Sequence, residues 1–505
     1  MKKTLAIIIA ALGCATANAQ EINAVVARQS NAAQEMTRLT NTPNVILTQN
    51  GITLKNGEQT VKGYNFSDGN ITVLFASAIN STQSIESLTH PVVIENGGLL
   101  TVSGTLDNGN AQDLVIEDGG QLRFESGTVN AQAKKEITGY SEGDGNWYLV
   151  ASPISETTAQ AVGMIDQTTP ENYDLYIFNQ SSSDGLEWNN YKVQPFNIGN
   201  QNGYLYAHKN GTTLVFDGQL AATATAKNLE FDNDAEFKGF NLIGNPYTCD
   251  AYINRNFYRM NTNGTELIPA FGAIHALEGV FVQATATGES VTFSKDAPAT
   301  QNGMCAMTLS QGTATIDRAI VNFGKGGSLD KFMLNESNTK LFIPQNSKDF
   351  AAVATEVTAG EMPVSFKAAK DGSYTITVNT ENVEAEYMHL IDNLTGADVD
   401  LLAAASTGSA SYSFEAKTSD YASRFKLVFG VKDENSEASE NFAYISNGEI
   451  IISNEGRATL QVVDVLGRIV SSEQINGDCR ISTNGLTAGL YILNLNGMTQ
   501  KIVVR

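Results

Sequence analysis

The chain has 505 residues, a formal net charge of −22 and 44 glycines. A chain this acidic repels nucleic acid and anionic lipid surfaces, so neither is expected as a partner. Hydrophobic residues make up 42% of the chain and charged residues only 17%. This balance is typical of a folded β-rich protein and not of a disordered acidic tail. The length predicts several domains.

Residues 1–19 have the pattern of a secretory signal peptide. Lys2 and Lys3 precede an apolar run from Leu5 to Leu12, and Ala17 to Ala19 supply the small residues of a cleavage site. We therefore expect cleavage between Ala19 and Gln20. Cys14 raises a lipoprotein as the alternative, although the residues before it match a lipobox poorly. The signal peptide predicts Sec-dependent passage into the periplasm, and because no other apolar run approaches the roughly 18 residues of a membrane helix, the mature chain is expected to be soluble.

Residues 20–135 are predicted to be a polar lead-in followed by β-solenoid-like repeats. The segment that begins at Val92 recurs from Leu114, and Ile94 matches Ile116 at an offset of 22 residues. A period of this length, with apolar residues at equivalent positions, is typical of stacked rungs that cover one another. A pair of similar hairpins in a sandwich is the alternative interpretation.

The same repeat aligns side chains that carry ligand-type oxygens. Glu95 aligns with Glu117, and Asn96 with Asp118, so stacking would set each pair about 5 Å apart. Polysaccharide lyases and glycosidases need acidic groups on one face, and Ca²⁺ prefers such oxygens too. Both pairs stand beside Gly-Gly turns, where acidic residues ordinarily face solvent. The favoured interpretation is therefore that these side chains are solvated surface residues without a catalytic or Ca²⁺-binding role. A Ca²⁺ hypothesis also applies to Asp232 to Asp234, which lack the Gly and Glu of a calcium loop.

Residues 136–300 contain a second duplication. Trp147 to Pro153 returns as Phe240 to Pro246, and Gly203 to Phe216 returns as Gly279 to Phe293. Each half reads as strands bounded by Gly, Asn and Pro. The pattern predicts two related β units packed into one sandwich.

Four aromatic residues in the first half suggest a binding hypothesis: Trp188, Tyr191, Tyr204 and Tyr206. Aromatic faces stack on sugar rings, so a glycan platform is one interpretation. The favoured interpretation places these rings in the sandwich core, because small-strand folds take aromatic residues readily.

Residues 301–432 are predicted to form another β-sandwich module. Arg424 to Phe429 alternate cleanly between polar and apolar positions, as a strand does. Residues 433–440 are polar and acidic with no apolar anchor, which predicts a linker.

The sequence shows no catalytic, cofactor or metal motif. No Gly-x-Ser-x-Gly occurs, and the histidines fall in different modules without a neighbouring ligand. These are His90, His208, His275 and His389. Three cysteines follow the signal peptide, Cys249, Cys305 and Cys479, and an odd number excludes a full disulfide framework. Two alternatives remain for these cysteines: a disulfide between Cys249 and Cys305, or buried free thiols.

Residues 441–505 read as short strands and tight turns. Leu490 to Leu495 alternate as a strand, and Asn496-Gly497 predicts a hairpin that pairs with Lys501 to Arg505. Another turn is expected at Thr487 to Gly489, where the glycine would supply a backbone angle that other residues resist. The tail is therefore expected to be a small Ig-like β-sandwich.

Three motifs occur in this tail: Asp464 to Arg468 (DVLGR), Gly489 to Leu493 (GLYIL) and the terminal Lys501 to Arg505 (KIVVR). In this order they resemble the C-terminal sorting domain of proteins exported by the type IX (Por) secretion system of Bacteroidetes. One departure is Phe442 to Ile445, which stands where many such domains begin with a Pro-Asn-Pro-like segment. The motif positions are Asp464, Leu466, Gly467, Arg468, Gly489, Tyr491, Lys501 and Val503.

The resemblance implies export by the type IX machinery to the outer-membrane surface or the extracellular space. It also implies cleavage near residues 433–440 by a sortase-like peptidase and attachment to anionic lipopolysaccharide. With no chemistry in the sequence, we expect a noncatalytic stalk or adhesin-like protein that meets a glycan or host-surface ligand. The alternative is a surface polysaccharide lyase or glycoside hydrolase that uses Glu95, Glu117 and Asp118.

Overall fold

The structure is a computed structural model, and strands dominate it. Residues described are 23–29, 35–39, 43–48, 50–65, 71–75, 78–81, 85, 88, 91–140, 146–183, 185–224, 226–298, 303–324, 327–356, 360–402, 409–430, 442–446, 448–454, 456–464 and 467–504. The predicted signal peptide and the predicted linker lie outside these residues, as does Leu466. No helix in the described ranges is long and apolar enough to cross a membrane. The chain is all-β, as predicted.

The first module contains two sheets. Its strands are β1 (Asn23–Gln29), β2 (Glu35–Leu39), β3 (Pro43–Thr48), β4 (Gly51–Asn56), β5 (Gln59–Asn65), β6 (Ile71–Phe75), β7 (Ala78–Ser81), β8 (Val92–Ile94), β9 (Leu99–Thr105), β10 (Leu114–Ile116), β11 (Gln121–Ser126) and β12 (Asn130–Ile137). One sheet contains β12-β10-β8-β6-β1-β2 in that order, and the other contains β11-β9-β7-β3-β4-β5.

The two copies of the 22-residue repeat lie directly beside each other. Strand β10 pairs in parallel with β8, which sets Leu114 opposite Val92, and β11 pairs in parallel with β9, which sets Leu122 opposite Leu100. All four side chains are buried. Asn108 adds a polar link between the copies, because its Nδ2 donates to the Asn130 carbonyl oxygen at 2.7 Å. The offset in the sequence is thus the offset of the backbone ladder.

The duplicated segment forms two units with the same strand order. The first unit uses β13 (Tyr148–Ala151), β14 (Glu156–Thr158), β15 (Tyr173–Phe178), β16 (Trp188–Asn190), β17 (Asn197–Gly199) and β18 (Gly203–His208). The second uses β21 (Phe240–Gly244), β22 (Ala251–Tyr252), β23 (Phe257–Met260), β24 (Leu267–Ala270), β25 (Ala273–Ile274) and β26 (Gly279–Gln283). Sheet β13-β18-β15-β16 matches β21-β26-β23-β24, and the pair β14-β17 matches β22-β25.

Glycines let the two units meet backbone to backbone. A Cβ on Gly203 would lie 2.7 Å from the Ile243 carbonyl oxygen, and one on Gly244 would lie 2.4 Å from the Asn202 carbonyl oxygen. An isolated antiparallel bridge joins Asn202 to Ile243 at this point. The two glycines are not equivalent in the duplication: Gly203 aligns with Gly279, whereas Gly244 aligns with Ala151.

The first module and the duplicated segment share a sheet and a core. Strand β19 (Thr212–Gln219) pairs antiparallel with β12 along its whole length and so extends the first sheet. One apolar cluster runs from Leu39 in the first module to Leu277 in the second unit. The ladder therefore continues across residue 136, where the sequence predicts a new module to begin.

The third module is built on one long sheet. Its strands are β28 (Gly303–Gln311), β29 (Ala314–Phe323), β30 (Leu329–Asp330), β31 (Lys340–Gln345), β32 (Lys348–Thr355), β33 (Glu361–Lys367), β34 (Gly372–Glu381), β35 (Tyr387–Asp392), β36 (Asp398–Asp400), β37 (Ala410–Ala416) and β38 (Phe425–Gly430). Strands from both ends of the sheet contribute to the same core, so the sheet folds over on itself. Two ion pairs lie inside the module, Asp317 with Lys331 and Asp392 with Arg424.

The tail has two sheets around a core of its own. Sheet β39-β40-β43 uses β39 (Ala443–Ser446), β40 (Glu449–Ile452) and β43 (Cys479–Ser482), and sheet β42-β41-β44-β45 uses β41 (Arg457–Asp464), β42 (Ile469–Asn476), β44 (Gly489–Leu495) and β45 (Met498–Val504). The predicted hairpin is confirmed: β44 pairs with β45 across Asn496 and Gly497, which have φ of 49° and 98°.

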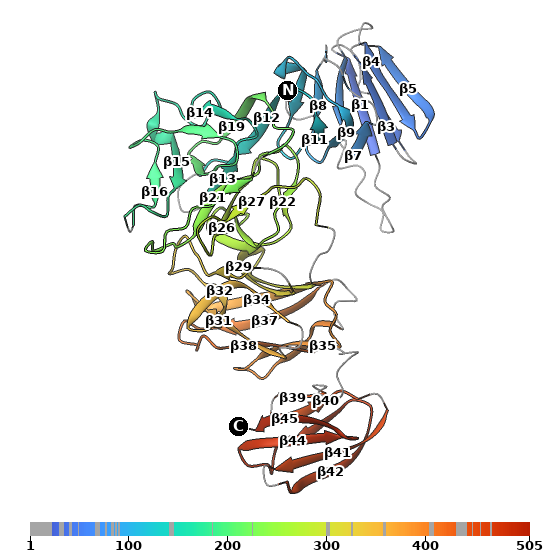
Figure 1. The fold of residues 1–505 in the computed structure, drawn as a ribbon, viewed down its shortest axis with the longest axis vertical. Helices are drawn as coiled ribbons and strands as arrows, with labels where there is room; N and C mark the ends of the chain where they lie inside the picture. Colours follow the sequence, from blue (N-terminus) through green and yellow to red (C-terminus); the bar gives the residue numbers. More distant parts are fainter. Residues whose placement is uncertain are drawn as a thin grey trace.

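The modules follow one another along the long axis of the molecule (Figure 1). The N-terminal sheets lie at one end, the two duplicated units and the third module follow, and the tail lies at the other end. Sequence order is thus spatial order, which leaves the tail accessible at one end of the molecule.

Candidate functional site

The DVLGR motif is a turn closed by its own first and last residues. The Asp464 carboxylate accepts from the Arg468 backbone N–H at 2.9 Å and from Arg468 Nε at 2.7 Å. Gly467, between them, has a φ of 79°, a left-handed value that a glycine adopts without strain. Motif residues at these positions therefore fix the reversal between β41 and β42.

The GLYIL motif opens β44, and Tyr491 anchors it. Its ring is buried, and its hydroxyl donates to the Thr487 carbonyl oxygen at 2.9 Å. The expectation for Gly489 is wrong, because its φ is not positive. The positive-φ glycine before β44 is Gly485, with a φ of 106°, and it lies in the preceding turn, which the Leu486 N–H closes on the Thr483 carbonyl oxygen.

The terminal motif divides between two faces of β45. Ile502 and Val504 are buried in the tail core, whereas Lys501 and Val503 point outward and are exposed. The motif thus supplies core contacts and surface side chains together.

A groove separates the tail from the third module. It has a volume of about 890 Å³, and its walls include Val503 from the tail and Pro363 from β33. Beside it, the Tyr444 hydroxyl donates to Asp398 Oδ2 at 3.2 Å and lies 3.3 Å from His389 Nδ1. These contacts connect β39 to the third module outside the linker.

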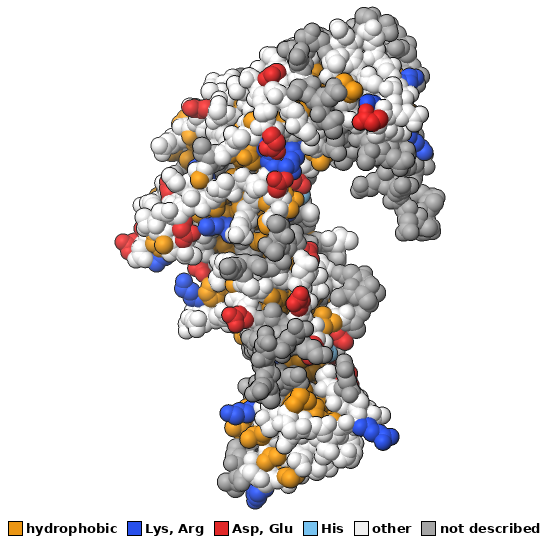
Figure 2. All heavy atoms as spheres, turned by 45° about the vertical axis from the view of Figure 1, so that its right-hand side comes forward, with side chains coloured by type: hydrophobic (Ala, Val, Ile, Leu, Met, Phe, Trp, Pro, Cys, Tyr) orange, Lys and Arg blue, Asp and Glu red, His pale blue; other side chains and the backbone are white. Residues whose placement is uncertain are grey.

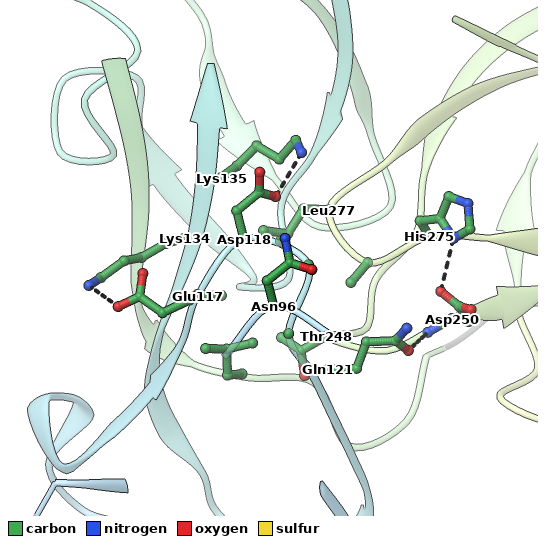
Figure 3. A pocket seen from close by; sticks show the side chains of 15 residues that line it. Asn96, Glu117, Asp118, Gln121, Lys134, Lys135, Thr248, Asp250, His275 and Leu277 are labelled. Atoms are coloured by element: carbon green, nitrogen blue, oxygen red, sulfur yellow. Dashed lines mark hydrogen bonds and ion pairs between the residues drawn. The ribbon is translucent and has the colours of Figure 1, made fainter. Parts of the chain in front are cut away.

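A smaller cavity lies between the first module and the second duplicated unit (Figure 3). Its volume is about 360 Å³, and it collects the predicted acidic residues Glu117 and Asp118. Each is ion-paired: Glu117 with Lys134 at 2.8 Å, and Asp118 with Lys135 at 2.7 Å. Figure 3 shows these two carboxylates directed to different sides of the strand. Glu95, the third residue of the hydrolase hypothesis, is not among the residues that line the cavity.

The opposite wall of this cavity holds a histidine–aspartate pair that sequence reasoning missed. His275 Nδ1 lies 3.1 Å from Asp250 Oδ1, and the hydrogen bond to Asp250 raises the pKa of His275. A second such pair joins His389 to Asp398 at 2.7 Å. Asp398 stands on β36, the neighbour of β35, whereas Asp250 and His275 stand next to the paired ends of β22 and β25. Only a correct strand register could have revealed either pair.

The four aromatic residues of the glycan hypothesis divide into two groups. Tyr204 and Tyr206 are buried, with 1% and 0% of their surface exposed, so the glycan interpretation is wrong for these two. The Tyr206 hydroxyl is used inside the core, where it donates to the Met164 carbonyl oxygen. Trp188 and Tyr191 are half-buried, and Trp188 packs edge-on against Phe178 and Phe281.

Cysteines and acidic groups form no metal cluster in the ranges that the structure describes. No group of three or more His, Cys, Asp or Glu side chains there is placed to hold a metal ion. In the Asp232 to Asp234 segment, one Asp232 oxygen accepts from the Asp234 N–H, and Lys238 bonds Asn233. Cys249, Cys305 and Cys479 are free, and burial raises the pKa of the Cys305 thiol to about 12.

Comparison with known proteins identifies the tail. Residues 446–505 match the family described as Secretion system C-terminal sorting domain, which includes all three motifs. The chain is therefore a type IX secretion substrate whose tail directs export to the cell surface or the extracellular space. No curated protein matches the chain, and no solved structure matches it.

Proposed function

We propose that this protein is a noncatalytic stalk or adhesin-like protein that the type IX machinery displays outside the cell. The observation that carries the proposal is the position of a self-contained sorting domain at one end of an extended row of β modules (Figure 1). Such an arrangement holds the N-terminal modules away from the point of export.

The N-terminal module is, in this proposal, a short β-solenoid. Support comes from the parallel pairing of β8 with β10 and of β9 with β11 at the period of the sequence repeat. Strands β6 and β7 continue both ladders in parallel by one more rung. Rungs that stack in this way give a stiff element that suits a stalk.

The proposed route begins with Sec-dependent export and cleavage before Gln20. The sortase-like peptidase then cuts near residues 433–440, and the mature protein is joined to anionic lipopolysaccharide or released. In a bacterium with a type IX system, deletion of residues 441–505 should leave the protein in the periplasm. Appearance of the truncated protein outside the cell would overturn the proposal. Mass spectrometry of the surface form should find no peptides from residues 481–505.

A surface polysaccharide lyase or glycoside hydrolase is the second candidate, with its site in the cavity of Figure 3. The ion pairs of Glu117 and Asp118 favour the noncatalytic alternative, because general acid–base catalysis needs a carboxyl group free to exchange a proton. The test is a polysaccharide panel with and without Ca²⁺. Turnover that Glu117→Gln abolishes would establish the enzyme and reject the stalk.

A further inference from the structure

Exposed apolar side chains are concentrated in the tail. Large hydrophobic residues with substantial exposure in the described ranges are Val61, Leu186, Val193, Leu394, Tyr421, Ile469, Val470, Leu490 and Val503. Four of these nine lie in the sorting domain, which is a small fraction of the chain. Figure 2 shows hydrophobic side chains gathered on the tail, with Lys and Arg side chains near its margins.

Strand register brings three of these four side chains onto one surface. Leu490 on β44 lies opposite Val503 on β45, and both point away from the core. The next outward position on β44 is Ile492, which lies opposite Val463 on β41. Val463 in turn lies opposite Ile469 on β42. We call these five residues the outer strip; it crosses all four strands of the sheet.

The inner face of the same sheet already has its partner. Leu460, Leu493 and Leu495 point inward and belong to the core that this sheet shares with the sheet β39-β40-β43. The outer strip is therefore not needed to close the tail sandwich. An apolar surface that the fold does not bury and that solvent does not favour indicates a protein contact.

In the part of the chain that the structure describes, both ends of the strip are exposed. The Val503 end opens into the groove of about 890 Å³ between tail and third module. Ile469, at the other end, is 55% exposed, and Val503 is 57% exposed. The Val503 end therefore faces the third module across the groove, whereas the Ile469 end, on the opposite edge strand of the sheet, is open to a partner among the described residues.

The charge of the tail also differs from that of the rest of the chain. Residues 441–505 contain five basic and five acidic residues, whereas the whole chain carries −22. The tail is thus neutral, and the net negative charge lies in the modules before it. Lys501 and Arg468, the latter paired with Asp464, are both exposed and stand beside the strip. Recognition here rests on apolar contact with a cationic margin and is free of the repulsion that an acidic surface would add.

We infer that the outer strip is the surface by which the type IX machinery recognises the folded tail. The partner is a machinery protein that presents an apolar patch with acidic groups at its margin. This inference rests on the proposed export route and adds the residues that make the contact. The buried motif residues, such as Tyr491, then act by holding the strip in shape.

The experiment compares export of full-length variants in a bacterium with a type IX system. Leu490→Ser with Val503→Ser should lower the amount outside the cell at least about tenfold, equivalent to about 1.4 kcal/mol of binding. Val193→Ser is the matched control, because Val193 is 85% exposed but lies in the duplicated segment. It should be exported like the wild type. Unchanged export of the double variant would overturn the inference.

Two further measurements make every outcome decisive. Limited proteolysis of the purified variants reports whether the tail stays folded. If the tail of the double variant is unfolded, the Ile469→Ser variant is tested in its place. Export of that variant at the wild-type level then rejects the outer strip as the recognition surface. Sedimentation of the wild-type chain tests a second copy as the occupant, and a dimer that the double variant abolishes without loss of export also rejects it. If deletion of residues 441–505 leaves export intact, the export route itself fails, and not only the strip.

Discussion

The third module and the tail are both β structures around an apolar core, but they treat charge in opposite ways. The third module buries Asp317, Asp392 and Arg424, each with 1% or less of its surface exposed. In the described part of the tail, no charged residue is buried, and in the pair of Asp464 and Arg468 the Arg468 side chain is 73% exposed and the Asp464 side chain 12% exposed.

This difference determines how each region should respond to substitution. A buried charge is tolerated only while its partner is present, so the third module depends on a few polar contacts. The tail depends on apolar packing, where losses scale with the volume removed. Substitutions in the two regions therefore test whether the third module depends on buried charge and the tail on apolar packing.

The largest effect is expected for Asp317→Asn in the third module. Lys331 Nζ lies 2.6 Å from both carboxylate oxygens of Asp317, and the two side chains are 3% and 0% exposed. Removing the carboxylate leaves Lys331 buried without a counter-charge, which should cost about 3 to 5 kcal/mol of unfolding free energy. Chemical denaturation measures the loss.

The control for this prediction removes both charges. Asp317→Asn with Lys331→Met should recover stability relative to Asp317→Asn alone, because no charge then stays buried. If the single and double variants are equally unstable, the loss comes from the hydrogen bonds that Asp317 accepts from the Leu341 and Arg318 N–H groups.

The next effect is expected in the tail core. Leu493 is fully buried between the two tail sheets, so Leu493→Ala should destabilise the tail by about 2 to 5 kcal/mol. Because the tail has a core of its own, the third module should keep its unfolding midpoint. Proteolysis with fragment sizing separates the two regions, and joint loss of both would contradict separate cores.

A smaller effect is expected for Tyr491→Phe. This change removes the hydroxyl that donates to Thr487 but keeps the buried ring, and it should cost about 1 kcal/mol. The tail should stay folded at ambient temperature. A shift in the tail melting temperature checks the prediction, and Tyr444→Phe, on the other tail sheet, provides a comparison.

The smallest effect is expected for Arg468→Gln. The Arg468 side chain is 73% exposed, and Asp464 keeps the hydrogen bond from the backbone N–H of residue 468 in the variant, so the ion pair should contribute only about 0 to 1 kcal/mol. The variant should melt close to the wild type, with the difference shrinking as salt is added. A loss comparable to that of Asp317→Asn would show that the tail relies on charge as the third module does.

Local patterns in the sequence predicted much of the tail and the repeats. Asn496-Gly497 predicted its hairpin because this dipeptide adopts the turn angles without strain, and the offset between Ile94 and Ile116 matched the ladder between β8 and β10. Patterns of this kind depend on residues close together in the chain, so the sequence displays them directly.

Contacts between distant segments were not predictable in the same way. The pairing of β12 with β19 brings together strands far apart in sequence, and no repeat or turn in the sequence predicts this pairing. The pairs of His275 with Asp250 and of His389 with Asp398 depend on strand register. The tyrosines of the glycan hypothesis show the same limit, since period-2 alternation does not tell which face of a strand is covered.

The glycine contact between the duplicated units has a steric consequence. At Gly203 and Gly244 the main chains of the two units meet, and the Leu242 and Ala151 side chains also lie against these glycines. A Cβ at either position would clash with a carbonyl oxygen of the other unit, so even an alanine would push the two units apart. The seam between the units therefore admits no added carbon atom at two single positions.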